Sequence, residues 1–194
     1  MSGAGLIPCG EKSVIQRVIE ASVAALGLLV ALPVIAICAV AIRATSSGPT
    51  FFVQERVGRF ERRFRCVKMR TMRADTLSVP THQAATDAIT PVGRVLRRTK
   101  LDELPQLWNV VRGEMSLVGP RPCLPMQTTL IEARRARGVY ALRPGITGLA
   151  QARGIDMSEP ERLAAVDAEY LARRSLPLDL KILLATLVPG APAP

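Results

Sequence analysis

The most regular feature of the hydrophobic pattern is an uncharged run near the N-terminus. Residues 21–42 carry no charge, and 11 of these 22 residues are Leu, Ile or Val. About 20 apolar residues suffice for a helix to cross the hydrocarbon core of a bilayer. At a few tenths of a kcal/mol each, the branched residues favour insertion by roughly 3–6 kcal/mol. The pattern therefore predicts a helix that enters a membrane.

Pro33 lies in the middle of this run, where it removes a backbone donor and bends or breaks a helix. Hydropathy alone leaves two topologies open: a kinked helix that spans the membrane, and a helix–break–helix hairpin that enters and leaves by one face. A cleaved signal peptide is a third interpretation, because residues 39–41 (Ala-Val-Ala) resemble a cleavage site. Signal peptides have apolar cores of about 7–15 residues, so a run of this length favours retention.

Beyond residue 46 the pattern predicts short elements. Loose alternation over residues 51–56 and 64–69 predicts a β-hairpin. A polar stretch at 73–90 predicts a surface loop, and two Pro/Gly-rich stretches, 118–122 and 143–148, predict rigid non-helical turns. Helical spacing of apolar residues occurs at 92–98, 104–111, 124–137, 163–173 and 178–188.

These elements predict an α+β fold that is mainly helical. Residues 1–46 are expected to form an N-terminal tail and the membrane helix, residues 47–188 a second domain, and residues 189–194 a C-terminal tail. The last predicted helix, 178–188, either packs in a core or lies flat as an amphipathic helix at the lipid interface.

Charge is distributed unevenly along the chain. The net charge is +10, and residues 43–100 hold 13 basic and four acidic side chains. Positive charge directly after an apolar segment is typical of the cytoplasmic side of a membrane and of contact with anionic lipid. Arg accounts for 22 of the 26 cations, and Arg binds phosphate in a bidentate way.

Cysteine and histidine usage argues against two kinds of site. Cys9, Cys38, Cys66 and Cys123 are scattered without paired spacing, so a disulfide framework or a zinc site is not expected. His82 is the single histidine and lies in a polar stretch, which argues against a His-based triad.

Candidate chemistry is concentrated in residues 97–108, where two adjacent carboxylates follow a group of cations. Thr99 with Asp102 fits a capping pattern, which predicts that a short helix starts here. Adjacent side chains point in different directions, so Asp102 and Glu103 are expected to have separate roles. In a structural interpretation both acids only favour a helix N-terminus, by about 1 kcal/mol or less. In the functional interpretation one carboxylate attacks phosphorus while the other holds a divalent cation.

Several short blocks occur in a fixed order along the chain. They are residues 47–52, 54–58, 68–72, 97–108, 112–122 and 143–151, followed by Asp167, Tyr170, Ser175 and Asp179. In this order they resemble the monotopic phosphoglycosyl transferases, the bacterial sugar transferase family. The resemblance extends from about residue 13 to residue 188.

The resemblance implies a reaction. Sugar-1-phosphate is expected to move from a UDP-sugar to undecaprenyl phosphate, a polyprenol phosphate, releasing UMP and starting assembly of a bacterial glycan such as exopolysaccharide, capsule, O-antigen or glycoprotein. By the same resemblance Asp102 is the expected nucleophile, which forms a covalent aspartyl-phosphosugar intermediate, and Glu103 helps to hold Mg²⁺. Both substrates and the attacking carboxylate are anionic, so cations must offset their repulsion.

The candidate phosphate-binding cations are Lys68, Arg70, Arg97, Arg121 and Arg143. Lys68 and Arg70 belong to the family's Lys-x-Arg block, and Arg97 lies five residues before Asp102. Arg121 and Arg143 are each placed in a proline-limited loop, which lowers the entropy lost on fixing a long side chain. The alternative for each cation is a solvated or lipid-facing charge.

The resemblance also bears on topology, because the family's membrane element is a re-entrant helix–break–helix. It favours the hairpin, with the catalytic domain on the cytoplasmic face of the bacterial inner membrane. The common break carries Ser-Pro, whereas this chain has Leu32-Pro33, and leucine cannot bond a freed backbone group. Larger members have extra membrane helices and a further domain, so a minimal catalytic form is expected here.

Two other classes of function are weighed against the transferase. A non-catalytic, membrane-anchored adaptor would bind anionic lipid through its basic face and would be supported by loss of the acidic pair, but both acids are present. A nucleic-acid binder would need aromatic platforms, and only 4% of residues are aromatic, so no nucleic-acid partner is expected. The blocks carry no signal for the sugar, the glycan pathway or the oligomeric state.

Overall fold

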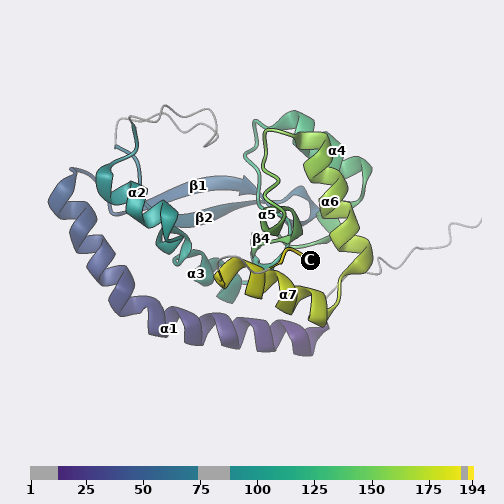
Figure 1. Ribbon diagram of the computed structural model, residues 1–194, viewed down its shortest axis with the longest axis horizontal. Helices are drawn as coiled ribbons and strands as arrows, with labels where there is room; N and C mark the ends of the chain where they lie inside the picture. Colours follow the sequence, from purple (N-terminus) through teal and green to yellow (C-terminus); the bar gives the residue numbers. More distant parts are fainter. Residues whose placement is uncertain (1–12, 74–87, 189–191) are drawn as a thin grey trace, which may run out of the picture.

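The structure, a computed structural model, describes residues 13–73, 88–188 and 192–194 of the chain. Within these residues, helices surround two small two-stranded sheets (Figure 1). The helices are α1 (Val14–Thr45), α2 (Pro91–Arg98), α3 (Gln106–Val111), α4 (Thr128–Ala136), α5 (Leu149–Ala152), α6 (Pro160–Arg173) and α7 (Leu176–Leu187). The strands are β1 (Phe51–Val57), β2 (Arg63–Met69), β3 (Ser116–Val118) and β4 (Gly145–Thr147). The predicted α+β fold with a long apolar helix and a small hairpin is confirmed.

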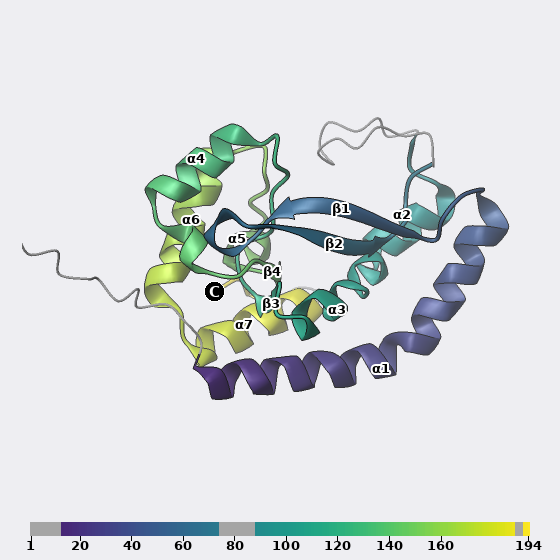
Figure 2. The ribbon, with the colours of Figure 1, turned by 180° about the vertical axis from the view of Figure 1, so that it is seen from behind.

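Helix α1 contains the whole uncharged run. It begins at a capping box, in which Ser13 Oγ accepts from the Gln16 N–H at 3.2 Å and Gln16 Oε1 accepts from the Ser13 N–H at 3.0 Å. Pro33 lies inside the helix, which bends along its length (Figures 1 and 2). The expected division into two helices is therefore corrected: the helix curves without a break.

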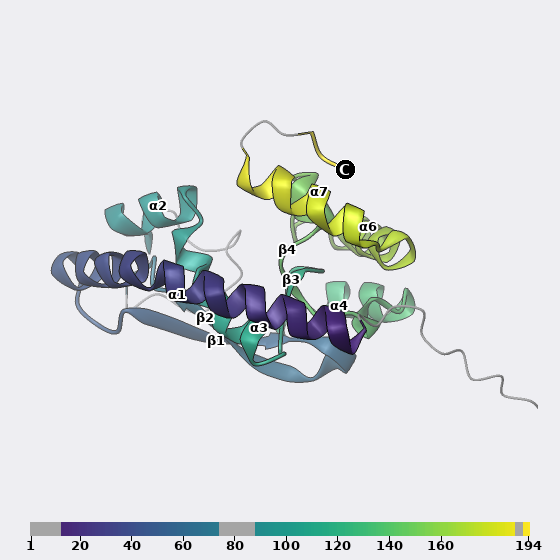
Figure 3. The same cartoon turned by 90° about the horizontal axis from the view of Figure 1, so that it is seen from below.

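The exposure of α1 differs from that of a core helix. Among the described residues it is the one helix long and apolar enough to cross a membrane by length and composition, and 22% of its most apolar window is buried. Viewed from below, α1 lies against α3, with the hairpin on one side and α6 and α7 on the other (Figure 3). Its outer face carries exposed apolar side chains, which include Ile15, Val18, Leu26, Leu29, Val30, Ile37 and Val40.

The hairpin forms where the sequence predicts it. Strands β1 and β2 pair antiparallel, from Phe51 opposite Met69 to Val57 opposite Arg63. Helix α3 is fixed to β2 by the buried Asn109, whose Nδ2 donates to Arg65 O at 2.8 Å and whose Oδ1 accepts from Val67 N at 3.1 Å. The strand that carries Lys68 is thereby held against the helix that follows the acidic pair.

The two Pro/Gly-rich stretches are more ordered than turns. Strand β3 leads into the first stretch and strand β4 lies within the second, and they pair in parallel, with Ser116 opposite Gly145 and Val118 opposite Thr147. A Cβ on Gly145 would lie 2.1 Å from Gly119 N, so only glycine permits this approach. The parallel pair brings the loop around Arg121 next to the loop around Arg143.

Several predicted boundaries are corrected. The helix expected at 124–137 begins at Thr128, because Leu124 precedes a proline and its N–H donates to Gln127 Oε1 at 2.9 Å. Helix α3 begins at Gln106 rather than Leu104, after a 3-10 turn. Most of the loop expected at 73–90 and half of the expected C-terminal tail lie outside the described residues.

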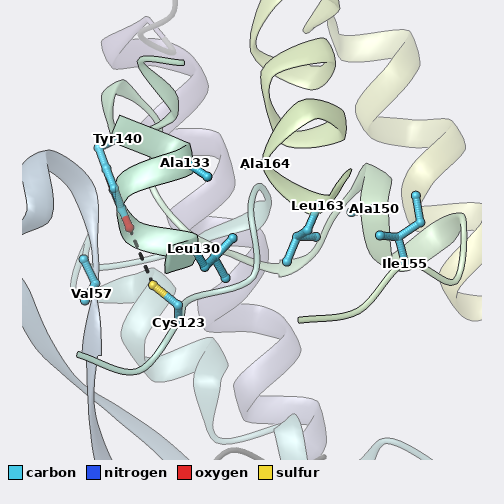
Figure 4. Packing of buried hydrophobic residues seen from close by; sticks show 9 residues of the cluster. All are labelled: Val57, Cys123, Leu130, Ala133, Tyr140, Ala150, Ile155, Leu163 and Ala164. Atoms are coloured by element: carbon cyan, nitrogen blue, oxygen red, sulfur yellow. Dashed lines mark hydrogen bonds between the residues drawn. The ribbon is translucent and has the colours of Figure 1, made fainter. Parts of the chain in front are cut away.

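The buried apolar side chains form several clusters, one of which lies between α4, α6 and the end of β1. In this cluster Tyr140 Oη and Cys123 Sγ are 3.6 Å apart (Figure 4). The other members are Val57, Leu130, Ala133, Ala150, Ile155, Leu163 and Ala164. This packing holds the loop that follows Arg121 against the hairpin and α4.

Candidate active site

The acidic pair follows directly on the end of α2, so the predicted helix start at Thr99 is wrong. Thr99 is the C-cap of α2, and its Oγ1 donates to Val95 O at 2.8 Å instead of capping a new helix. Lys100 takes a left-handed conformation with φ 58°, which is uncommon for a side-chain-bearing residue. The chain then continues as a 3-10 turn, Leu101–Glu103, on which both acids lie.

The two acids have different surroundings, and their separate roles stay a prediction. Glu103 Oε1 accepts from Lys68 Nζ at 2.8 Å and from Arg121 Nη2 at 2.6 Å. Asp102 is 8% exposed, yet within the described part of the chain its carboxylate has neither a hydrogen bond nor an ion pair. One acid is therefore doubly paired, while the other keeps its oxygen lone pairs available.

Ionisation follows these surroundings. Burial disfavours the charge of Glu103, but the Arg121 and Lys68 cations with their hydrogen bonds outweigh it and lower the pKa of Glu103 to about 2. Burial, together with the negative charge of Glu103, raises the pKa of Asp102 above its ordinary value. For Lys68, burial and the neighbouring Arg121 cation lower the pKa.

The structure brings three of the five predicted cations around the acidic pair. Lys68 and Arg121 contact Glu103 directly. Arg97 Nε donates to Thr71 Oγ1 at 2.8 Å, and burial lowers the pKa of Arg97 while the nearby Asp102 charge opposes that shift. All three side chains line the same cleft as Asp102.

The other two predicted cations are placed differently. Arg70 borders the cleft, but its guanidinium donates to Ser47 O and, through Nη2, to Ser46 O and Oγ at 3.0 and 2.8 Å. Arg70 thus ties the end of α1 to the hairpin. Arg143 does not line the cleft, and its Nε donates to Gly113 O at 2.9 Å.

Sequence reasoning missed several polar side chains of the cleft. Gln54 and Arg56 both line it, and their positions two apart on β1 are a period-2 signal that could have placed them on one face. Arg56 Nη1 also donates to Pro122 O at 3.0 Å. The contact of Thr71 with Arg97 could not be predicted from the sequence, because the two residues are 26 positions apart.

The cleft itself is large, with a volume of ≈ 1060 Å³. One wall comes from the hairpin and the acidic turn, and the opposite wall from α5, the start of α6 and the end of α7, where Gln151, Met157 and Leu187 contribute. A cleft of this size accommodates a ligand larger than a typical drug. A nucleotide sugar is of that class.

The carboxylates of the cleft are oxygen donors of the kind that bind metal ions. No group of three or more His, Cys, Asp and Glu side chains suitable for a metal occurs in residues 13–73, 88–188 and 192–194. Mg²⁺, however, is usually held by one or two carboxylates together with substrate phosphates and water. Asp102 and Glu103 supply hard oxygen donors of this kind in the same cleft as Lys68, Arg97 and Arg121, so the residues fit a metal that arrives with its substrate.

With this geometry in view, the comparison with known proteins is decisive. Residues 11–190 match the family described as bacterial sugar transferase. The chain belongs to the bacterial sugar transferase family. The resemblance inferred from the ordered blocks is confirmed over nearly the whole chain.

Relatives of this chain come from several bacteria. The UDP-glucose:undecaprenyl-phosphate glucose-1-phosphate transferase of Caulobacter vibrioides is 42% identical over 182 residues, which is 89% of this chain and 68% of that protein. The undecaprenyl-phosphate glucose phosphotransferase of Komagataeibacter xylinus is 37% identical, over 89% of this chain and 35% of that protein. The UDP-galactose-lipid carrier transferase of Erwinia amylovora is 38% identical, over 72% of this chain and 33% of that protein.

The chain thus spans about two thirds of one of these relatives and about a third of the other two. The matched part contains the acidic pair, the cationic side chains and both parallel strands, since the family match covers residues 11–190. The relatives are named for different sugars, glucose or galactose.

Proposed function

We propose that the protein transfers a sugar-1-phosphate from a UDP-sugar to undecaprenyl phosphate and releases UMP. The single observation that carries this proposal is the Asp102 carboxylate, which is buried and makes no hydrogen bond or ion pair with the described residues, beside an ion-paired Glu103 in a cationic cleft. The names of relatives that transfer glucose-1-phosphate to undecaprenyl phosphate support it.

The proposed reaction has two displacements at one phosphorus atom. An Asp102 oxygen attacks the sugar-bearing phosphorus of the UDP-sugar, and the bond from that phosphorus to the bridging oxygen breaks, so UMP leaves with the bridging oxygen. A phosphate oxygen of undecaprenyl phosphate then attacks the same phosphorus and breaks its bond to Asp102. The covalent step lets two anionic substrates bind in turn.

The cations carry the electrostatic part of this mechanism. Negative charge on the phosphoryl oxygens and on Asp102 must be offset before in-line attack becomes feasible. Lys68 and Arg121 already converge on one oxygen of Glu103, so their remaining N–H groups are held at the position where donor phosphates would bind. Arg97 adds a third cation, oriented by Thr71.

We also propose Mg²⁺ as the cofactor, with Glu103 as its protein ligand. Both protein hydrogen bonds of Glu103 go to Oε1, which leaves Oε2 as the oxygen able to face a cation. When bound, Mg²⁺ would offset the charge of the diphosphate. Protein side chains bind and orient the phosphates.

The lipid acceptor requires a protein that binds at a membrane surface, and helix α1 provides a membrane-binding element. Undecaprenyl phosphate has its phosphate at the surface of a bilayer, and α1 presents an exposed apolar face beside the domain that carries the cleft. We therefore propose that the protein lies at the cytoplasmic face of the bacterial inner membrane. The product would start the assembly of a bacterial glycan.

The first prediction tests the covalent step with the donor alone. Detergent-solubilised protein is mixed with UDP-glucose and Mg²⁺, without lipid acceptor, and its mass is measured. A mass increase equal to one glucose phosphate is expected on Asp102, with about one UMP released per chain. Asp102→Asn keeps the size of the side chain but removes the nucleophile, so turnover with undecaprenyl phosphate should fall by roughly a thousandfold or more.

Two controls make the outcome unambiguous. UDP-galactose is tested in parallel, so that failure with one sugar is separated from failure of the chemistry, and EDTA is expected to suppress UMP release. Full turnover by Asp102→Asn would eliminate Asp102 as nucleophile. Vesicle binding without UMP release from either sugar would instead favour a basic membrane adaptor.

A further inference from the structure

The loop that carries Arg121 is held at four consecutive carbonyl groups. Pro120 and Pro122 have no N–H, so this loop is fixed mainly through its acceptors. The donors are Gly145 N to Pro120 O at 2.9 Å, Arg134 Nη1 to Arg121 O at 2.9 Å, Arg56 Nη1 to Pro122 O at 3.0 Å and Val57 N to Cys123 O at 3.0 Å. Three separate elements, β4, α4 and β1, thus restrain one short stretch of backbone.

Arg134 is the more deeply buried of the two side-chain donors. It lies on α4 with 2% of its surface exposed, and its Nε and Nη2 donate to Asp167 Oδ2 on α6 at 2.9 and 2.7 Å. The guanidinium is planar, so fixing one edge on Asp167 also fixes the direction of Nη1. Nη1 is the atom that donates to Arg121 O.

Arg121 is therefore restrained at its backbone and engaged at its side chain. Its guanidinium contacts Glu103 at 2.6 Å and is 36% exposed in the cleft, where it can meet an anion. A shift of the Arg121 carbonyl would move the guanidinium with it. A misplacement of about 1 Å can lower the rate of an enzyme by around a hundredfold.

We infer that Arg134 and Asp167 are positioning residues, which hold Arg121 where it binds the phosphate of the donor. This inference rests on the proposed transferase function. A pair of apolar side chains could pack α4 against α6 equally well, because buried ion pairs can often be replaced by hydrophobic residues without loss of stability. Only a donor at the Nη1 position, however, satisfies the Arg121 carbonyl.

The test is a double-mutant cycle with Arg121. Arg134→Met/Asp167→Leu removes both charges together, so no unpaired charge is left buried. In detergent-solubilised full-length protein with UDP-glucose, Mg²⁺ and undecaprenyl phosphate, kcat/KM for UMP release should fall about 10–100-fold. In an Arg121→Ala background the same change should lower kcat/KM less than about threefold, because the residue it positions is gone.

A matched control comes from the next residue of α4. Arg135 forms an exposed ion pair with Glu61, and none of its contacts reaches the Arg121 loop, so Arg135→Met should leave kcat/KM within about twofold of wild type. If the double variant melts well below wild type, Arg134→Lys repeats the cycle. Lysine at this position keeps the ion pair with Asp167 but lacks the planar guanidinium. We again expect kcat/KM to fall when Arg121 is present and to change little in the Arg121→Ala background.

The outcomes separate this inference from the proposed function. If the double variant lowers kcat/KM by the same factor with and without Arg121, the inference is overturned. The loss would then come from Asp167 itself, which also borders the cleft, or from altered packing of α4 on α6. Unchanged kcat/KM in the double variant would overturn it as well. Absence of UMP release from wild type, or full activity of Asp102→Asn, would instead remove the proposed transferase function itself.

Discussion

Asp102 and Glu103 are adjacent carboxylates, and at the residue scale their hydrogen bonds separate them. Glu103 accepts two charged donors, which stabilise its negative charge and lower its pKa to about 2. A carboxylate stabilised in this way is a weaker nucleophile, because two cations already stabilise the negative charge that it would donate. Asp102 is buried without such donors among the described residues, and burial raises its pKa. We therefore expect the Asp102 carboxylate to be a better nucleophile than the Glu103 carboxylate.

The second prediction compares two cations that the sequence alone treats alike. Lys68→Met should lower kcat/KM for UMP release by about 10²–10³-fold, since removing one donor to developing charge in an active site has this effect. Arg143→Met should lower it by less than about tenfold, because Arg143 bonds Gly113 O and does not line the cleft. Steady-state kinetics with UDP-glucose measures both variants.

The melting temperature of both variants is measured as a control, because a variant that unfolds would also lose activity without any change in phosphate binding. An Arg143→Met protein that melts like wild type and loses as much activity as Lys68→Met would place Arg143 in the site. That result would restore its predicted role as a phosphate-binding cation.

From the sequence, side chains that lie near one another could be predicted where they belong to recognisable blocks, while their chemical roles stay predictions. Lys68, Glu103 and Arg121 were named in advance and lie together in the structure. Arg134 was not named, because its role depends on a backbone carbonyl 13 positions away and on burial against α6. Contacts through the backbone leave no pattern in residue type, so sequence reasoning could not find them.

At the element scale, α1 is attached to the rest of the molecule at both ends. Near its start, Glu20 Oε1 accepts from Ser116 Oγ at 2.5 Å and from Leu117 N at 2.6 Å. After its end, Ser46 O and Oγ accept from Arg70 Nη2. These polar anchors join an apolar helix to β3 and to the hairpin, so the position of α1 is coupled to the walls of the cleft.

The third prediction addresses the anchor at the end of α1. Arg70 is 6% exposed and donates to two carbonyl groups, and hydrogen bonds to charged groups contribute about 1.5–3 kcal/mol each. Arg70→Met should therefore lower the melting temperature in detergent by roughly 5–15 °C for a chain of this size. The measurement is thermal unfolding followed by tryptophan fluorescence.

Arg62→Met is the matched control, because Arg62 is exposed and lies at the C-cap of the 3-10 turn Arg59–Glu61 between β1 and β2. Its melting temperature should equal that of wild type. If Arg70→Met also melts like wild type but loses affinity for UDP-glucose, Arg70 acts on phosphate as the sequence suggested, and the anchor contributes little.

Elements with a repeating pattern were predictable, and those made by pairing at a distance were not. The 22-residue uncharged run and the alternation of the hairpin gave α1, β1 and β2. Strands β3 and β4 have three residues each and pair across 29 positions, which is too short for any periodicity. The end of α2 at Arg98 was predicted, but the helix start at Thr99 was wrong, because Thr99 satisfies a capping pattern in sequence and bonds backward to Val95 O in the structure.

At the scale of the whole molecule, the two anchors of α1 bear on how it meets a membrane. A 32-residue helix is about 48 Å long if straight, more than the roughly 30 Å of a hydrocarbon core. A spanning helix would place its two ends on opposite sides of that core. In the structure Glu20 and Ser46 both contact the domain that carries the cleft, and α1 bends around that domain (Figure 2). If the contacts of Glu20 and Ser46 with this domain persist in a membrane, both ends of α1 must lie on the same side of the bilayer as the domain.

The last prediction is therefore that both ends of α1 face the cytoplasm. Cys9 precedes the helix, and Cys38, Cys66 and Cys123 are buried, so an impermeant thiol reagent reports mainly on Cys9. A second probe is Ala44→Cys, an exposed position in the last turn, introduced together with Cys9→Ser. In spheroplasts neither probe should be labelled, and both should be labelled after lysis. Cys9→Ser alone gives the background from the buried thiols.

Each labelling pattern has one structural meaning. Labelling of Cys9 in intact spheroplasts, without labelling of the thiol introduced by Ala44→Cys, would mean that the helix crosses, and the contacts of Glu20 with Ser116 and Leu117 could not persist in the membrane. Glu20 provides an independent check, because Glu20→Gln weakens its contacts with Ser116 and Leu117, which a re-entrant helix keeps, and removes its ion pair with Arg17 inside α1. If the helix is re-entrant, this variant should melt earlier than wild type in lipid nanodiscs by more than Arg17→Met, whereas in a spanning helix the two variants lose only the same ion pair and should melt alike.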